Sequence, residues 1–241
     1  MNLFLRLAFL FFIGSVTGWI MELMYRNFRK PIKKWVNPGF CTGPYVPLYG
    51  FGLCILYLLA LLEQYHWISD PIWNRIMLFA VMALCMTALE YLAGIFCLRV
   101  MKVRLWDYSD LPGNYQGIIC PQFSVIWALL GGVYYFLIHP YILEALMWLS
   151  GNLAFSFVIG LFFGVFIMDF ANSAQLTVKL KAYAEKNNVV LKYEHIKQDI
   201  RKKSDESKKK YHFFRPFRAE RPLADVLRDL RHSVEIYNKK E

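Results

Sequence analysis

Five long apolar segments constrain this chain more than any other feature of its sequence. They cover residues 3–24, 45–62, 72–98, 118–138 and 149–170. A helix needs about 20 mostly apolar residues to cross the hydrocarbon core of a bilayer, and the second segment reaches this length only if it begins near Tyr45. We therefore predict an all-α fold, an integral membrane bundle of five transmembrane helices.

The composition separates the chain into two parts. Hydrophobic residues make up 57% and charged residues 19%, whereas soluble domains are about 45–50% apolar and about 25% charged. Of the 28 Lys and Arg residues, 18 lie in residues 171–241. This distribution excludes a single soluble globule, a disordered chain and a disulfide-stapled secreted domain. We predict a transmembrane domain at 1–170 and a basic cytoplasmic tail at 171–241, with tail helices beginning at Ser173 and Pro222.

The loops predict the orientation. Segments 63–71 and 139–148 contain no Lys or Arg, whereas basic residues follow the first and third apolar segments. These basic residues are Arg26, Arg29, Lys30, Lys33, Lys34, Arg99, Lys102 and Arg104. Because basic loops remain cytoplasmic, we expect a multi-pass protein of the cell membrane with its N-terminus outside and its C-terminus inside. The first segment lacks a small-residue cleavage site, so we expect a retained helix rather than a signal peptide.

Two segments before the second and fourth helices look alike. One reads Pro-Gly-x-x-x-Gly-x-x-x-Pro-x-Tyr over residues 38–49, and the other reads Pro-Gly-x-x-x-Gly-x-x-x-Pro-x-Phe over residues 112–123. Each follows a helix that carries one glutamate, Glu22 or Glu90. We interpret this as a duplicated helix–loop–helix unit in parallel orientation. Chance recurrence of Pro at helix starts and Gly in turns is the alternative.

The two glutamates are the main candidates for a functional site. Ionisable groups within a membrane span are costly and suggest function by default. Glu22 and Glu90, together with Asp169, fall in the cytoplasmic halves of their helices, so they can converge near the Pro-Gly loops. The loop between the third and fourth helices adds further polar side chains. The candidate substrate-binding residues are Glu22, Glu90, Arg104, Asp107, Tyr108, Asn114 and Gln116.

These residues predict a polar vestibule, open to the cytoplasm, for a small polar solute, headgroup or ion. Arg104 would supply a planar fork for an anion, and the loop side chains would supply orienting hydrogen bonds. A structural role is the equally weighted alternative for Glu22 and Glu90, which would then pair with arginines and fasten the loops. For Asp169 we favour the structural role. We expect Gly14-x-x-x-Gly18 and Gly160-x-x-x-Gly164 to pack helices within the chain.

Catalytic, metal and cofactor motifs are missing from the sequence. It contains no G-x-S-x-G, no H-E-x-x-H and no G-x-x-x-x-G-K-[ST], so it has no P-loop ATPase of its own. The five Cys residues show no C-x-x-C spacing, which argues against a zinc site. We assign no catalytic residue, metal or cofactor, and we lean against an enzyme.

The basic tail suggests partners of its own. A helix from Pro222 would carry an apolar stripe flanked by Arg228 and Arg231, which is typical of binding to anionic membrane lipid or to the groove of a protein partner. Aromatic and basic residues at 211–218 also resemble a nucleic-acid surface. Ten acidic residues are interspersed in the tail, so we disfavour nucleic acid.

Several of these motifs together resemble a known family. They are Gly18-Trp19-Ile20-Met21-Glu22, Asn37-Pro38-Gly39-Phe40-x-x-Gly43-Pro44, Pro47-Leu48-Tyr49-Gly50 and, most specific, Trp106-Asp107-Tyr108-Ser109-x-x-Pro112-x-Asn114-x-x-Gly117-x-Ile119-Cys120. Roughly residues 7–135 are similar to the ABC-transporter permease type IV family of bacterial membrane proteins. The resemblance implies a permease that works with a separate ATPase subunit. The family usually has a basic residue after that last glycine, where this chain has Ile118, so a charge contact is expected to be missing there.

Three functions follow as hypotheses. The leading one is a transporter or permease component that binds a small polar solute and takes its energy from a partner. The second is a membrane-embedded enzyme on lipid headgroups, with Glu22, Glu90 or Asp107 as acid or base beside Arg104. The third is a membrane scaffold that presents the basic tail to lipid or a protein.

Overall fold

The computed structural model describes residues 2–29, 37–101, 103–187 and 191–192. Helices account for nearly all of the regular structure in these ranges. In chain order the elements are α1 (Leu3–Arg29), α2 (Pro47–Ala60), η1 (Leu61–Tyr65), α3 (Pro71–Arg99), β1 (Val103–Arg104), α4 (Pro121–Val133), η2 (Tyr134–Ile138), α5 (His139–Gly151), η3 (Leu153–Phe155), α6 (Ser156–Asn187) and β2 (Leu191–Lys192). The two short strands pair in parallel.

Five helical stretches are long and apolar enough to cross a membrane, which confirms the predicted number. They are Leu3–Phe28, Pro47–Tyr65, Pro71–Arg99, Pro121–Gly151 and Ser156–Gln175. Large apolar side chains such as Phe4, Leu84 and Phe157 are more than 70% exposed. A soluble protein rarely exposes so much apolar surface, whereas a bilayer covers it with hydrocarbon.

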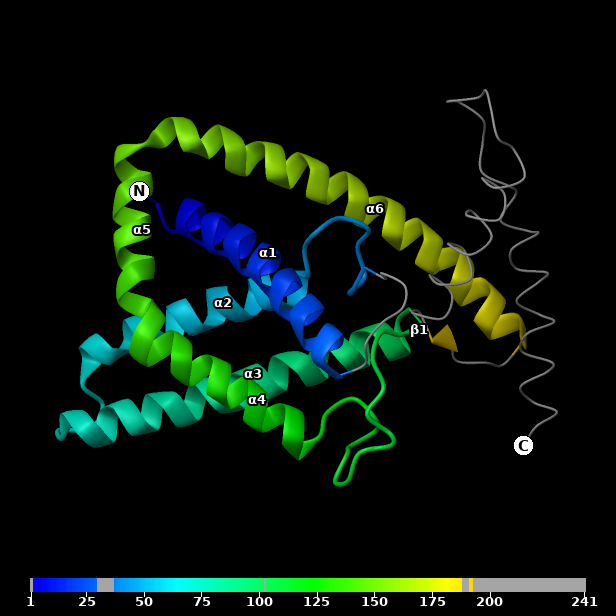
Figure 1. The fold of residues 1–241 in the computed structure, drawn as a ribbon, viewed down its shortest axis with the longest axis horizontal. Coiled ribbons are helices and arrows are strands. Elements are labelled where there is room, and N and C mark those ends of the chain that lie inside the picture. Colours follow the sequence, from blue (N-terminus) through cyan, green and yellow to red (C-terminus); the bar gives the residue numbers. More distant parts are fainter. Residues whose placement is uncertain (1, 30–36, 102, 188–190, 193–241) are drawn as a thin grey trace.

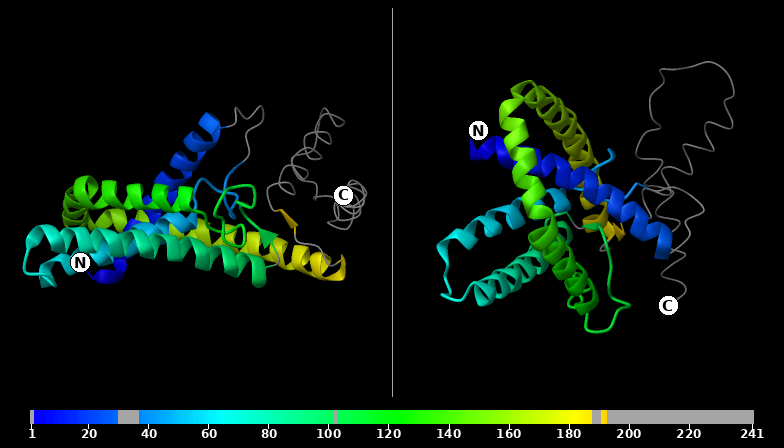
Figure 2. Two further views of the ribbon diagram at one scale, coloured as in Figure 1. Left: turned by 90° about the horizontal axis from the view of Figure 1, so that it is seen from below. Right: turned by 60° about the vertical axis from the view of Figure 1, so that its left-hand side comes forward.

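The helices are arranged so that the loops gather at two opposite ends. α2, α3 and α4 run roughly alongside one another and α1 crosses them obliquely (Figure 1). The turn between α2 and α3, helix α5 and the N-terminus lie at one end (Figures 1 and 2). The loops at 37–46 and 105–120 and the last turns of α6 lie towards the other end. Both Pro-Gly loops are thus on the same side of the bundle.

The core forms where α1, α2, α3 and α4 meet. Leu10, Tyr57 and Met82 are fully buried there, and Trp127 is 6% exposed. Tyr57 lies in the last turn of α2 and is fully buried, so its hydroxyl needs a partner. It accepts a hydrogen bond from Arg6 Nη1 at 3.4 Å. Arg6 therefore binds within the bundle near its N-terminal end.

The segment 139–148, which we predicted to be a loop, is helical. α4 continues through a π-helical turn, η2, into α5. Pro140 lies in the first turn of α5 and has no N–H to donate to the preceding turn. The widened π-helical turn just before it takes up the steric conflict that Pro creates with the preceding turn. The helix bends here, so that α5 runs across one end of the bundle towards α6 (Figure 1).

The last span also continues further than predicted. α6 is one helix from Ser156 to Asn187, whereas the sequence suggested a break before a new helix capped by Ser173. That prediction of a cap was wrong, because Ser173 is buried within the helix and its hydroxyl finds no partner among the described residues. No Pro or Gly interrupts the chain at this point. The predicted helix from Pro222 lies outside the described residues.

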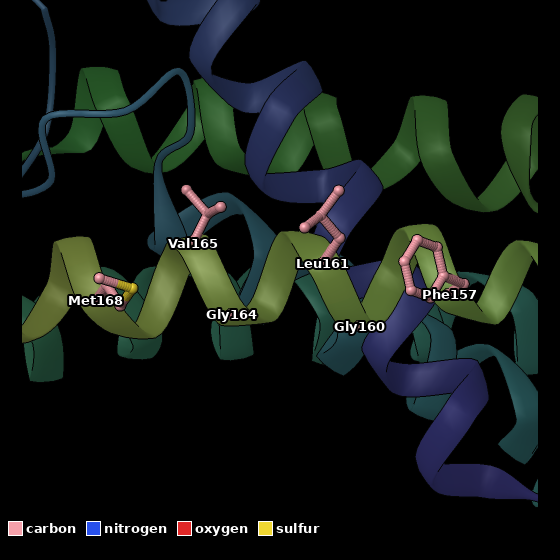
Figure 3. Close-up of a pocket in the computed structure, with 6 residues that line it drawn as sticks. All are labelled: Phe157, Gly160, Leu161, Gly164, Val165 and Met168. Carbon is pink, nitrogen blue, oxygen red and sulfur yellow. The ribbon is translucent and has the colours of Figure 1, made fainter.

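The two glycine pairs differ. Gly14 and Gly18 face α2, and a Cβ at Gly18 would overlap the Tyr49 ring, so the predicted packing within the chain is confirmed there. Gly160 and Gly164 have no described atom within 4 Å of a Cβ position. The same prediction was wrong for this pair, which forms the floor of a shallow apolar groove along α6 (Figure 3). Phe157, Leu161, Val165 and Met168 line that groove.

Candidate functional site: a paired-carboxylate cluster

The two Pro-Gly loops share their local backbone geometry. Gly39 and Gly113, which follow the first Pro of each motif, have φ values of 83° and 69°. The residues before Pro47 and Pro121 are extended, and each Pro then opens a helix. A φ in this left-handed region favours glycine. The first glycines of the two motifs therefore share a backbone conformation, as a duplication predicts, whereas of the second glycines Gly117 has a positive φ of 66° and Gly43 does not.

The first loop is fastened to α6 by Asp169. This carboxylate accepts hydrogen bonds from the backbone N–H of Thr42 at 3.0 Å and of Gly43 at 2.9 Å. It also accepts bonds from the Thr42 hydroxyl and, at 2.6 Å, from the Tyr45 hydroxyl. Burial, and next the hydrogen bond to Asp169, raise the pKa of Tyr45 above its ordinary value. Asp169 therefore has the structural role that we favoured.

Asn37 organises the same loop from within. Its side-chain oxygen accepts a hydrogen bond from the Trp19 indole, and its amide donates to the carbonyl oxygens of Thr42 and Gly43. One amide side chain thus satisfies backbone groups that no helix or strand pairs.

In the second loop, three of the predicted site residues bind one another or the backbone. Arg104 Nη1 lies 2.8 Å from Asp107 Oδ1, and the Ser109 hydroxyl donates to the same carboxylate oxygen at 2.6 Å. Asn114 donates to the carbonyl oxygen of Leu111 at 2.8 Å and accepts from the Gly117 N–H at 3.1 Å. These contacts hold the loop in shape, so the geometry gives Arg104, Asp107 and Asn114 a positioning role.

Gln116 occupies the turn at the tip of this loop. It is exposed and has a φ of 56°. Ile118, the residue after the turn, donates its N–H to the Tyr115 carbonyl at 3.0 Å. The Ile118 side chain is 4% exposed and packs against Gly94 of α3. The position where a charge was expected by resemblance is therefore buried and apolar.

Glu22 is satisfied by its neighbours on α1 and α2. Arg26, one turn further along α1, places Nε 2.7 Å from Glu22 Oε1. The Tyr49 hydroxyl donates to Glu22 Oε2 at 3.2 Å. The Glu22 side chain is 24% exposed and that of Arg26 is 21% exposed, so this ion pair remains at the edge of the bundle.

Glu90 is more deeply buried and less well satisfied. Only 2% of the residue is exposed. The Tyr108 hydroxyl donates to Oε1 at 2.9 Å, whereas Oε2 has no hydrogen-bond partner among the described residues. The indole of Trp127 lies close to this carboxylate without forming a hydrogen bond of good geometry to Oε2. A half-satisfied buried carboxylate is a departure from normal packing.

Two tyrosines connect the two carboxylates. Tyr49 lies within electrostatic range of Glu90 as well as Glu22, and Tyr108 lies within range of Glu22 as well as Glu90. Burial, and next the charge of Glu90, raise the pKa of Tyr108, so its phenol remains a donor. We call Glu22, Arg26, Tyr49, Glu90 and Tyr108 the paired-carboxylate cluster. It holds two carboxylates and one guanidinium.

Aromatic rings surround this cluster. Phe123 stacks on Tyr108 with centroids 4.3 Å apart and planes 7° apart, and Tyr49 contacts Trp127 at 5.1 Å. Glu90 is thus 2% exposed in a largely aromatic environment.

The structure brings Glu22, Glu90 and Tyr108 together, as the sequence suggested for the two glutamates. It places Arg104, Asp107, Asn114 and Gln116 in a loop with its own bonds. Sequence reasoning missed Tyr49 and Trp127 as neighbours of the carboxylates. The signal for Tyr49 was present, because it ends the first Pro-Gly motif on the turn of α2 that follows the loop.

Neither metal nor disulfide chemistry is evident in the described ranges. Within them, no group of three or more His, Cys, Asp or Glu side chains could hold a metal ion. All five cysteines are free.

The fold and the cluster define a multi-pass helical membrane protein with a buried polar site. A family model described as "Putative ABC-transporter type IV" matches residues 9–174. The chain belongs to this family, and the match reaches beyond residue 135 into α6. No curated protein and no solved structure shows a significant match to the chain.

Proposed function

We propose that this protein is a permease component that binds a small polar solute at the paired-carboxylate cluster. The observation that carries the proposal is the meeting of Glu22 and Glu90, from α1 and α3, through Tyr49 and Tyr108. Ionisable groups within membrane spans mark solute or ion pathways. Membership of a transporter-related family also supports a role in transport.

The proposed orientation places the cluster near the cytoplasm. The ends of α1 and α3, which carry Arg26, Arg29 and Arg99, lie towards the end of the bundle that holds both Pro-Gly loops (Figure 1), and basic residues favour the cytoplasmic side. The N-terminus would then lie outside the cell membrane and the tail inside. This orientation makes the loops at 37–46 and 105–120 accessible to a soluble subunit.

The energy source would be a separate ATPase. The chain contains no G-x-x-x-x-G-K-[ST] motif, which a P-loop needs to hold phosphates and magnesium. An ATPase subunit that contacts the cytoplasmic loops would supply hydrolysis, as the transporter family suggests. The basic tail would bind anionic lipid of the inner leaflet or a protein partner.

The enzyme hypothesis receives less support. It uses Glu22, Glu90 or Asp107 as an acid or base beside Arg104, and Arg104 is already paired with Asp107 at 2.8 Å. The tail that the scaffold hypothesis depends on lies outside the described residues beyond Lys192.

A matched pair of variants tests the permease proposal. Glu90→Gln alters the cluster, whereas Glu63→Gln changes a glutamate that pairs with Arg75 at the opposite end. We expect cells with Glu90→Gln to match cells that lack the protein in their profile of small polar solutes, and cells with Glu63→Gln to match wild type. Equal profiles for wild type, Glu90→Gln and cells lacking the protein would contradict the proposal. Purification of the wild type from native membranes should also recover a P-loop ATPase.

A further inference from the structure

The two units of the duplication differ in one respect that concerns Glu90. In the first unit Arg26 follows Glu22 by four residues and pairs with it. In the second unit Gly94 follows Glu90 by four residues. A side chain at Gly94 would overlap Ile118 and approach Trp106. Apolar atoms therefore fill the position in the second unit that corresponds to Arg26 in the first.

No other described cation replaces it. Arg104, the nearest arginine of the second loop, is bound to Asp107 and Ser109. Arg26 is bound to Glu22. Glu90 is left with one hydrogen bond of good geometry, from the Tyr108 phenol, with the Trp127 indole close by, and its buried Oε2 atom has no hydrogen-bond partner among the described residues. An ionised carboxylate in such surroundings would be an uncompensated buried charge, which proteins avoid by pairing or neutralising the group.

We infer that Glu90 is a proton-binding site, with Oε2 as the atom that carries the proton. Tyr108 occupies Oε1 as a donor, which leaves Oε2 to be protonated. A proton needs no cavity, whereas a metal ion needs several oxygen ligands, and the described residues form no such group. The biological role of this proton rests on the proposed function. If the cluster binds the solute, the proton on Glu90 changes the charge of that binding site.

The surroundings of Glu90 determine how readily it changes its charge. Its titratable and charged neighbours are Tyr108 of the loop, Tyr49 of α2, and Glu22 with Arg26 of α1. The neighbour from α4 is Trp127, which does not titrate. Loss of the proton would give the cluster a second carboxylate charge, and Tyr49 and Tyr108 lie within electrostatic range of both glutamates. Deprotonation would therefore attract a positive group into the cluster, and protonation would release it.

Infrared spectroscopy of the purified full chain in lipid nanodiscs tests this inference without knowledge of the solute. At neutral pH we expect a carbonyl stretching band of a protonated carboxylic acid. Glu90→Gln should lose that band, and Glu63→Gln should retain it. Absence of the band from wild type, or its persistence in Glu90→Gln, would overturn the inference.

A second variant covers the case in which Glu90→Gln fails to fold. Tyr108→Phe removes the donor that favours the ionised carboxylate, so the pH at which the band disappears should move upward. An unchanged pH would count against Glu90 as the source of the band.

The outcomes also separate this inference from the proposed function. If the purified Glu90→Gln variant loses the band, and cells with this variant keep the wild-type solute profile, the proton site stands and the permease proposal fails. If cells with Glu90→Gln have the solute profile of cells that lack the protein, and the purified Glu90→Gln variant retains the band, the permease proposal stands and the proton site fails.

Discussion

Gly18 is the residue that lets Tyr49 reach Glu22. A Cβ at this position would overlap Cβ and Cγ of Tyr49, so α1 and α2 approach each other without a side chain between them. Small residues permit such approach in membrane bundles. The hydrogen bond between Tyr49 and Glu22 therefore depends on a residue that contributes no polar atom.

We predict that Gly18→Ala lowers the free energy of unfolding by about 1–3 kcal/mol, because overpacking forces the helices apart. Thermal unfolding in detergent micelles would measure the loss. Gly160→Ala is the matched control, since no described atom lies within 4 Å of its Cβ position. The control should change stability by no more than about 1 kcal/mol. An equal loss in both variants would contradict the assigned packing.

Tyr108 gives a pH-dependent prediction. Burial, and next the nearby Glu90, raise its pKa above the ordinary 10.0. Its contribution to stability is complete below about pH 10 and is lost as the pH rises above the unfolded-state value. We expect the free energy of unfolding to fall more steeply above about pH 10 in wild type than in Tyr108→Phe, as measured by denaturant unfolding at several pH values.

The control for that titration is Tyr115→Phe, because the Tyr115 ring is 56% exposed. This variant should follow wild type at high pH. If the free energy of unfolding fell equally steeply with pH in wild type and in Tyr108→Phe, the folded structure would not raise the pKa of Tyr108.

Single residues show which parts of the site could be predicted from sequence. Glu22 and Glu90 were identifiable because a carboxylate within an apolar run is rare. Tyr49 and Trp127 were not, because which of many aromatic rings faces a carboxylate depends on how the helices are rotated. The pair of Arg104 and Asp107 is local, three residues apart, and could have been recognised as a loop contact.

At the scale of elements, α6 is attached to the bundle on one side. Phe162, Phe163 and Phe166 contact aromatic rings of α1, and Phe170 contacts Phe40 of the first loop. Asp169 adds the hydrogen bonds to Thr42, Gly43 and Tyr45. The opposite face of α6 carries the groove of Figure 3. The first loop and α6 should therefore move together.

We predict that Asp169→Asn weakens this attachment by about 1.5–3 kcal/mol, the usual range for hydrogen bonds to a charged group. Hydrogen exchange should become at least about tenfold faster at the Thr42 and Gly43 amides. Asp70→Asn, which changes the cap of α3 at the other end, should leave these two amides unaffected. Unchanged exchange in Asp169→Asn would contradict the role of the carboxylate.

The elements also show where sequence patterns fail. The five spans were predictable from apolar length alone. Their ends were not, because the pattern of charge and Pro near residue 140 resembles a loop, and a single π-helical turn lets the helix continue. The absence of a helix-breaking residue after Phe170 predicted the continuity of α6 better than the capping potential of Ser173 did.

For the whole molecule, the orientation is the prediction with the widest consequences. We expect a membrane-impermeant maleimide applied to intact cells to label Gln64→Cys and to spare Asp110→Cys. Both residues are exposed, and they lie at opposite ends of the bundle. The unsubstituted chain, whose five cysteines are buried or half-buried, is the background control. The reverse pattern would place the Pro-Gly loops outside the cell.

Arg26 pairs with Glu22, whereas Gly94 stands four residues after Glu90, and this difference has a consequence for the bundle as a whole. Gly39 and Gly113 share a left-handed backbone conformation, whereas of the two glutamates Glu22 alone has an arginine partner among the described residues. The carboxylate on α1 is neutralised by an arginine, whereas the carboxylate on α3 has an oxygen without a partner among the described residues. The bundle is therefore chemically asymmetric. An arginine in place of Gly94 would offer Glu90 a counter-ion and reduce this difference, but its Cβ would overlap the Ile118 side chain.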